Sequence, residues 1–214
     1  LYNKTEQRFV YTGGRAYGTP AGYCDTLKDT RSDVEIFSWK TELDYVTSIN
    51  SRFLDGYCYT ILKDKEEHRY LYSYALRYQY GWESIVKNKK YSLEKATDLD
   101  KAKFFGASAQ RTYLIYATGS KLYAYDYVAE TTKVLEDLGD QEITLLHYDI
   151  LIDTGTNDDF FYLGTYDPSQ PKETGGTLTR YRVVNDPNNI LVEKVPGFSW
   201  SGLCKIKSID FKKY

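Results

Sequence analysis

Short runs of aromatic and β-branched residues, separated by glycine-rich or charged turns, recur along the chain. The clearest pair lies within residues 113–127, where two apolar arms flank a turn at Gly119. Aromatic and branched side chains favour strands, and a glycine between two such arms favours a tight turn. This segment therefore predicts a β-hairpin.

Three further segments resemble this hairpin, which indicates a repeat. The predicted first strands begin at Phe9, Tyr57, Tyr113 and Phe160, so that successive starts are 48, 56 and 47 residues apart. This spacing suits four-stranded propeller blades with loop insertions. We predict an all-β fold, a β-propeller-like array of about four antiparallel blades. An immunoglobulin-like sandwich is the alternative for an all-β chain with strands this short.

The remaining strands of each blade are predicted from the segments around the hairpins. Second hairpin strands are expected at 34–39, 70–76 and 178–184, inner or closing strands at 103–108, 143–148 and 204–211, and outer strands at 132–137 and 189–195. Residues 15–33 are rich in Gly, Thr and Asp and predict an ordered loop. Residues 85–99 have no apolar stripe of helical period, so we expect no helix there and an edge strand at 91–95. No Pro-, Gly- or Ser-rich linker divides the chain, so residues 1–214 are expected to form a single domain.

Composition excludes some classes of protein and changes the picture of the chain's start. The 214 residues include 23 Tyr and carry a net charge of −2, so there is no basic footprint for nucleic acid. No apolar run approaches the roughly 20 residues that span a bilayer. The chain lacks Met and begins at Leu1, which predicts a processed or trimmed product. The cysteines, Cys24, Cys58 and Cys204, form no CxxC pair and are expected to be small buried residues.

Catalytic and metal-binding patterns are weak. His68 lies in a charged turn and His147 in an apolar strand, so neither suggests a ligand, and no Gly-x-Ser-x-Gly elbow supports a catalytic triad. The acidic loop 153–159 has alternating oxygen donors but lacks the glycine and the distal Glu of an EF-hand. We therefore expect no catalytic residue, no metal site and no cofactor.

Aromatic side chains are the candidates for binding. Trp39, Trp82 and Trp200 are the three tryptophans, and Tyr78 and Tyr80 alternate toward Trp82 before a glycine turn. Flat exposed aromatics stack on sugars and anchor partner proteins, although they also cap strand edges. We expect the loops 77–82 and 197–202 to carry these contacts.

Four motifs give the chain a family resemblance. They are Leu-Tyr-Ala-Tyr-Asp-Tyr at 122–127, Leu-Gly-Asp-Gln-Glu-Ile-Thr-Leu-Leu at 138–146, Gly-Gly-Thr-Leu-Thr-Arg-Tyr-Arg-Val at 175–183 and Lys-Ile-Lys-Ser-Ile-Asp-Phe-Lys at 205–212. Together they resemble the C-terminal part of PKD-like family lipoproteins of Bacteroides-type bacteria, over roughly residues 100–214. The resemblance implies a lipid-anchored surface protein that works beside an outer-membrane nutrient importer, with sandwich domains ahead of the propeller. The chain would then be either the C-terminal part of a longer lipoprotein or a short relative of the family.

These observations lead to a functional prediction. We expect a non-enzymatic accessory lipoprotein of the outer-membrane surface, with a binding or scaffold role in glycan or peptide uptake. The expected partners are the importer and its surface lipoproteins, without nucleic acid, and the membrane is reached only through a lipid anchor outside this chain. The alternative is a propeller-type polysaccharide hydrolase or lyase. Two acidic residues facing each other across a central channel would favour that alternative.

Overall fold

The computed structural model divides the chain into two compact units, Leu1–Lys95 and Ala96–Tyr214. The structure describes residues 2–3, 8–12, 26–29, 35–38, 44–52, 57–79, 82–108, 112–149, 159–184 and 189–208, and within these the side chains of 59–73, 89–108, 112–148, 159–184 and 189–208. The expectation of a single domain over residues 1–214 stays a prediction.

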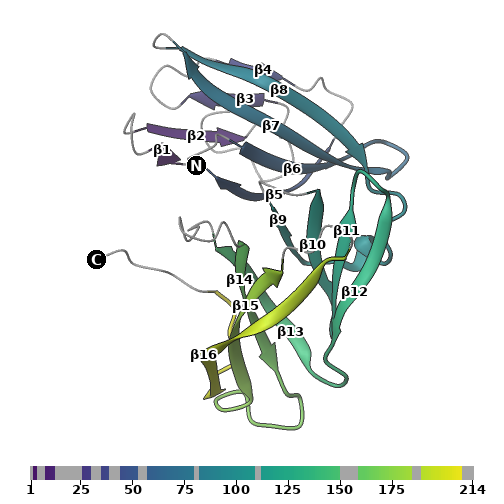
Figure 1. Ribbon diagram of the computed structural model, residues 1–214, viewed down its shortest axis with the longest axis vertical. Coiled ribbons are helices and arrows are strands. Elements are labelled where there is room, and N and C mark those ends of the chain that lie inside the picture. Colours follow the sequence, from purple (N-terminus) through teal and green to yellow (C-terminus); the bar gives the residue numbers. More distant parts are fainter. Residues whose placement is uncertain are drawn as a thin grey trace. The chain divides into compact units, whose positions relative to one another are not determined.

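The first unit contains two four-stranded antiparallel sheets (Figure 1). The strands of one sheet are β1 (Tyr2–Asn3), β2 (Arg8–Thr12), β3 (Thr26–Asp29) and β4 (Glu35–Ser38). Those of the other are β5 (Asp44–Arg52), β6 (Tyr57–Lys63), β7 (Arg69–Gln79) and β8 (Trp82–Ser92). The predicted loop at 15–33 is therefore wrong in part, because Thr26–Asp29 pairs with both β2 and β4 despite its polar sequence.

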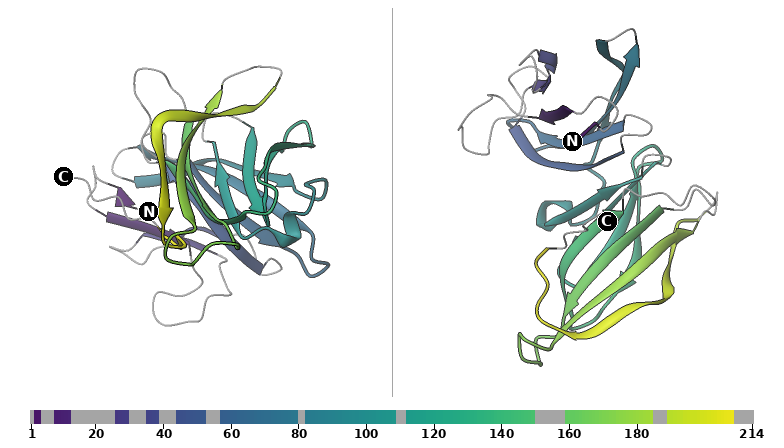
Figure 2. Two further views of the ribbon diagram at one scale, coloured as in Figure 1. Left: turned by 90° about the horizontal axis from the view of Figure 1, so that it is seen from below. Right: turned by 90° about the vertical axis from the view of Figure 1, so that its left-hand side faces the viewer.

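The second unit also contains two four-stranded antiparallel sheets. The first has β9 (Phe104–Ala107), β10 (Tyr113–Thr118), β11 (Lys121–Asp126) and β12 (Thr131–Asp137), preceded by the short 3-10 helix η1 (Leu99–Lys101). The second has β13 (Glu142–Asp149), β14 (Asp159–Tyr166), β15 (Gly176–Val184) and β16 (Leu191–Leu203). Figure 2 shows β16, in yellow, along the outer edge of its sheet.

The observed topology confirms the all-β prediction and the hairpin repeat. The predicted starts Phe9, Tyr57, Tyr113 and Phe160 fall at or within one residue of the starts of β2, β6, β10 and β14, which are the second strands of the four sheets. In every sheet the spatial order of the strands follows their order along the chain. Such meanders differ from the Greek-key connections of an immunoglobulin-like sandwich.

Two sequence predictions at the C-terminal end need correction. The outer strand expected at 189–195 continues to Leu203, because β16 keeps its pairing with β15 through two register shifts. The closing strand expected at 204–211 does not form over 204–208, and residues 209–211 lie outside the described part. We call residues 204–208 the C-terminal strap.

The strap lies close to the start of β15 because Gly176 has no side chain. A side chain at Gly176 would meet the backbone oxygen of Leu203 at 2.7 Å and would also meet the carbonyl of Cys204. The Lys205 backbone N–H donates to the Lys172 carbonyl at 2.7 Å, which ties the strap to the loop between β14 and β15. The Gly-Gly-Thr-Leu motif therefore has a physical reason, since only glycine permits this backbone approach.

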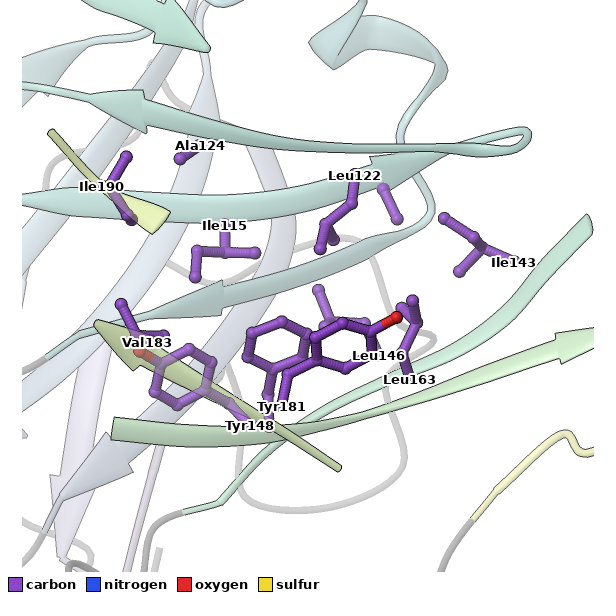
Figure 3. Close-up of a cluster of buried hydrophobic side chains, with 12 residues drawn as sticks. Ile115, Leu122, Ala124, Ile143, Leu146, Tyr148, Leu163, Tyr181, Val183 and Ile190 are labelled. Carbon is purple, nitrogen blue, oxygen red and sulfur yellow. The ribbon is translucent and has the colours of Figure 1, made fainter. Parts of the chain in front are cut away.

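The core of the second unit lies between its two sheets (Figure 3). Phe161 is fully buried at its centre, with its ring 5.2 Å from Tyr181 and 6.2 Å from Tyr148 between centroids. Leucine, isoleucine and alanine side chains of β10 and β11 complete the cluster from the other sheet. A side chain at Gly106 would meet Tyr148 Cδ2 at 2.5 Å, so the small residue predicted in this inner strand lets β9 approach β13.

Candidate functional site

Of the five aromatic residues predicted to bind, the structure describes the side chain of Trp200 alone. Trp39 and Tyr80 lie outside the described residues. Tyr78 and Trp82 lie in β7 and β8, on neighbouring strands, but their side chains are outside the described part. The grouping of Tyr78 and Tyr80 beside Trp82 therefore stays a prediction, as does the binding role of Trp39.

Trp200 lies in a strand and not in the loop that was expected at 197–202. It pairs with Leu178 across the β15–β16 ladder, and Ser199 pairs with Thr179. The Thr179 and Ser199 hydroxyl oxygens lie 3.0 Å apart, so they share a hydrogen bond across the strands. The loop prediction was wrong because Gly197 and Gly202 stand within β16, where the sequence pattern alone indicates turns.

The alternation of side chains places Trp200 on the face of its sheet that is turned away from the core cluster. Phe161, Leu163, Tyr181 and Val183 point into the cluster. Side chains next to them along each strand point to the opposite face. That face carries Phe160, Tyr162, Arg180, Phe198 and Trp200, which we call the aromatic face.

Two residues of the aromatic face are open to solvent. Phe198 is 40% exposed and Trp200 is 43% exposed, while Phe160 and Tyr162, in β14 on the other side of β15, are buried. The Phe198 and Trp200 rings meet edge to face, with centroids 6.0 Å apart and an interplanar angle of 89°. An edge-to-face pair is a favourable aromatic geometry, so each ring restrains the orientation of the other.

Arg180 connects the buried rings to the exposed ones. Its guanidinium carbon lies 4.1 Å from the ring centroid of Phe160, 5.3 Å from Phe198 and 5.8 Å from Tyr162. These distances allow cation–π attraction, which is stronger where water is excluded. The face therefore combines exposed aromatic area with an ordered positive charge. Sequence reasoning missed Arg180. It alternates with its neighbours along a predicted strand, which would have placed it on the same face as Leu178 and Arg182.

The charged turn that contains His68 is held together by hydrogen bonds to Asp64. Asp64 accepts hydrogen bonds from the backbone N–H groups of Glu66 and His68 at 3.0 and 2.9 Å and from the Tyr70 hydroxyl at 3.1 Å. Partial burial favours the neutral acid, but the hydrogen bonds from His68 and Tyr70 hold the pKa of Asp64 below its usual value. Asp64, Glu66 and His68 have ligand atoms within 4.8 Å of one another. These contacts account for the cluster as a stabilised turn.

Asp159 is the one buried charged residue among the described side chains. It begins β14 and accepts a hydrogen bond from the Ser108 hydroxyl, which follows β9. This contact joins the two sheets of the second unit. The rest of the acidic loop, residues 153–158, lies outside the described residues.

Cys204 is exposed, so its expected burial was wrong, because the chain leaves the sheet at the end of β16.

No protein-family model, curated protein or solved structure matches the chain. The resemblance to PKD-like lipoproteins therefore rests on the four sequence motifs and stays a prediction. In the part of the chain that the structure describes, no helix has the length and apolar character needed to cross a membrane.

Proposed function

We propose that this protein is a non-enzymatic binding module that works at the surface of the outer membrane, beside a nutrient importer and its lipoproteins. The observation that carries the proposal is the aromatic face, where Phe198 and Trp200 are exposed next to the ordered guanidinium of Arg180. Trp and Arg are enriched among the residues that dominate protein interfaces. The membrane location and the importer come from the family resemblance.

The favoured ligand of the aromatic face is a partner protein of the uptake complex. A rigid aromatic pair loses little conformational freedom on binding, and the contact of Phe198 with Arg180 helps to hold the pair in place. A glycan that stacks on Trp200 is the other ligand class that such a surface serves. The two are separated by testing the protein with solubilised importer and with a panel of oligosaccharides.

The test is co-purification of the full chain with the importer from solubilised membranes. Trp200→Ala removes an exposed hot-spot candidate and should weaken binding by about 30-fold, the effect of roughly 2 kcal/mol. Val134→Ala is the control, because Val134 is an apolar residue that is 47% exposed in β12, an outer strand of the other sheet of this unit. Equal binding by both variants and the wild type would contradict the proposal for this face. Trp82→Ala tests the second predicted contact in the same assay.

The proposed architecture is a propeller-like array in which each four-stranded meander is a blade. Four successive meanders of equal strand number support it, as does the packing of the third and fourth sheets through a shared core. Small-angle scattering distinguishes a closed array from two separately tumbling units. An experimental profile that fits only separate units would contradict the propeller arrangement.

The non-enzymatic role has a direct test of its own. The full chain should hydrolyse or cleave nothing in a broad panel of polysaccharides and peptides. Turnover that disappears in Asp158→Asn or Asp159→Asn would instead establish the alternative, a propeller-type hydrolase or lyase.

A further inference from the structure

A cavity of about 310 Å³ lies in the second unit, beside the turn between β10 and β11. Its wall is made by the last residue of η1 and the residues that follow it, by the start of β13 and by the C-terminal strap. Its volume is at the lower end of the range for small-molecule sites. The cavity is separate from the aromatic face, and none of the five residues of that face lines it.

The lining of this cavity is strongly positive. Among the described residues that line it, Lys101, Lys103, Lys205 and Lys207 contribute four ammonium groups, and Glu142 contributes the one carboxylate. The four lysines form two Lys-x-Lys pairs that are distant in sequence and meet at this site through the fold. Each pair is visible in the sequence, but no local pattern predicts that the two pairs meet.

Two of the four lysines already have carboxylate partners. Lys205 donates to Glu142 at 2.5 Å and lies 4.9 Å from the Tyr166 ring centroid, which fixes its position. Lys101 pairs with Asp98 at 2.5 Å. Among the residues that the structure describes, Lys103 and Lys207 have no ion-pair partner. The cavity therefore has two positive charges that no carboxylate of the described residues neutralises.

A buried hydroxyl provides a second, independent observation. Thr144 lines the cavity and is 7% exposed, and its Oγ1 atom has no hydrogen-bond partner in the described structure. Buried polar groups are normally paired, because an unmade hydrogen bond costs free energy. A solvated lysine surface would explain the free ammonium groups, but it would not explain this hydroxyl. The Oγ1 atom is covered by its neighbours, so a bound oxygen atom that reaches it after a small side-chain shift would account for both.

We propose that this cavity binds a sulfate or phosphate group of a small ligand. A doubly negative group matches the two uncompensated ammonium charges, and its several oxygens can accept from lysine and hydroxyl donors at once. The remaining volume accommodates about one sugar-sized substituent. The strap positions Lys207, so the site exists only when residues 204–208 are held against the sheet.

The experiment is titration calorimetry of the full chain with inorganic sulfate and with inorganic phosphate, at constant ionic strength. Lys103→Ala and Lys207→Ala should each weaken binding about tenfold, because each removes a charged donor. Lys65→Ala, which removes the same charge from an exposed turn of the first unit, is the control and should leave binding unchanged. No binding, or equal binding by all three variants, which would indicate an adventitious ion only, would overturn the proposal.

A second variant separates ligand binding from folding. Thr144→Val replaces the hydroxyl by a methyl group of similar shape, so thermal stability without ligand should be unchanged or raised. Binding of sulfate or phosphate should nevertheless fall about tenfold. Full binding by this variant would overturn the assignment of Thr144 to the site.

The source of the anionic group is found with two further probes. A sulfated monosaccharide tests a soluble glycan, and vesicles that contain phosphatidylglycerol test a lipid headgroup. Stronger binding of either probe, lost in Lys103→Ala and Lys207→Ala, supports the site and identifies its source. Binding of both probes that the two variants leave unchanged would overturn it. The result is independent of the aromatic face, so failure here leaves the proposed function standing.

Discussion

Replacing Gly176 by alanine tests the close approach between β15 and the C-terminal strap. The added methyl group would lie 2.7 Å from the Leu203 carbonyl oxygen and would meet the carbonyl of Cys204 as well. Both obstacles are backbone atoms, so no side-chain rotation relieves the clash. The strap must therefore move away from the sheet.

The expected cost combines two terms. Overpacking a close contact costs about 1–3 kcal/mol. Displacing the strap also weakens the hydrogen bond from the Lys205 N–H to the Lys172 carbonyl, which contributes about 1 kcal/mol. We expect Gly176→Ala to lower the free energy of unfolding by about 2–4 kcal/mol, measured by urea denaturation.

The control distinguishes this clash from a general effect of replacing glycine. Gly139→Ala places a methyl group where no atom lies within 4 Å, although its φ of +64° carries a strain of about 1–2 kcal/mol. Hydrogen exchange gives the local measurement: the Lys205 amide should lose protection in Gly176→Ala and keep it in Gly139→Ala. Unchanged protection of that amide in Gly176→Ala would refute the reasoning, whatever the change in global stability.

Three further predictions concern the core of the second unit. Phe161→Ala should destabilise the protein by about 3–5 kcal/mol in urea denaturation, because it removes a fully buried ring; a loss below about 1 kcal/mol would contradict the packing. Burial raises the pKa of Tyr116 and, with a hydrogen bond to a neighbouring glutamate, that of Tyr181. In the unfolded chain the pKa of each tyrosine lies near 10. The free energy of unfolding should therefore fall above pH 10, by up to about 1.4 kcal/mol per pH unit for each tyrosine. Tyr181→Phe should make this fall less steep. Ser108→Ala should cost about 1–3 kcal/mol in denaturation, since it removes a donor from the buried Asp159; no measurable cost would show that water replaces it.

The sequence predicted strands better than it predicted where they end. The hairpin at β10 and β11 was placed correctly because its turn glycine and aromatic arms are local signals. The strand Thr26–Asp29 was missed because its polar residues carry no strand pattern, and its pairing with two neighbours overrides that composition. The end of β16 was missed for the opposite reason, since its internal glycines imitate turns.

The sequence predicted the candidate sites less well than it predicted the fold. Trp200 was selected by residue type, and the structure places it on an exposed face. Its neighbour Phe198 contacts Arg180, and this contact depends on the register between β15 and β16, which includes two shifts that no local pattern encodes. The same limit applies to Lys103 and Lys207, which line one cavity although most of the second unit separates them in sequence.

The sequence by itself determined the class of the fold, because aromatic and branched runs between glycine turns form antiparallel hairpins through local interactions. It did not determine which faces of the strands become buried. All eight residues of β14 are buried, from Asp159 to Tyr166, so alternation within that strand does not reveal its two different environments. Only tertiary packing decided that one face of β14 joins the core and the other supports the aromatic face. The physical reason is that burial depends on neighbouring strands and sheets, whose approach is set by long-range register and by backbone contacts such as that at Gly176.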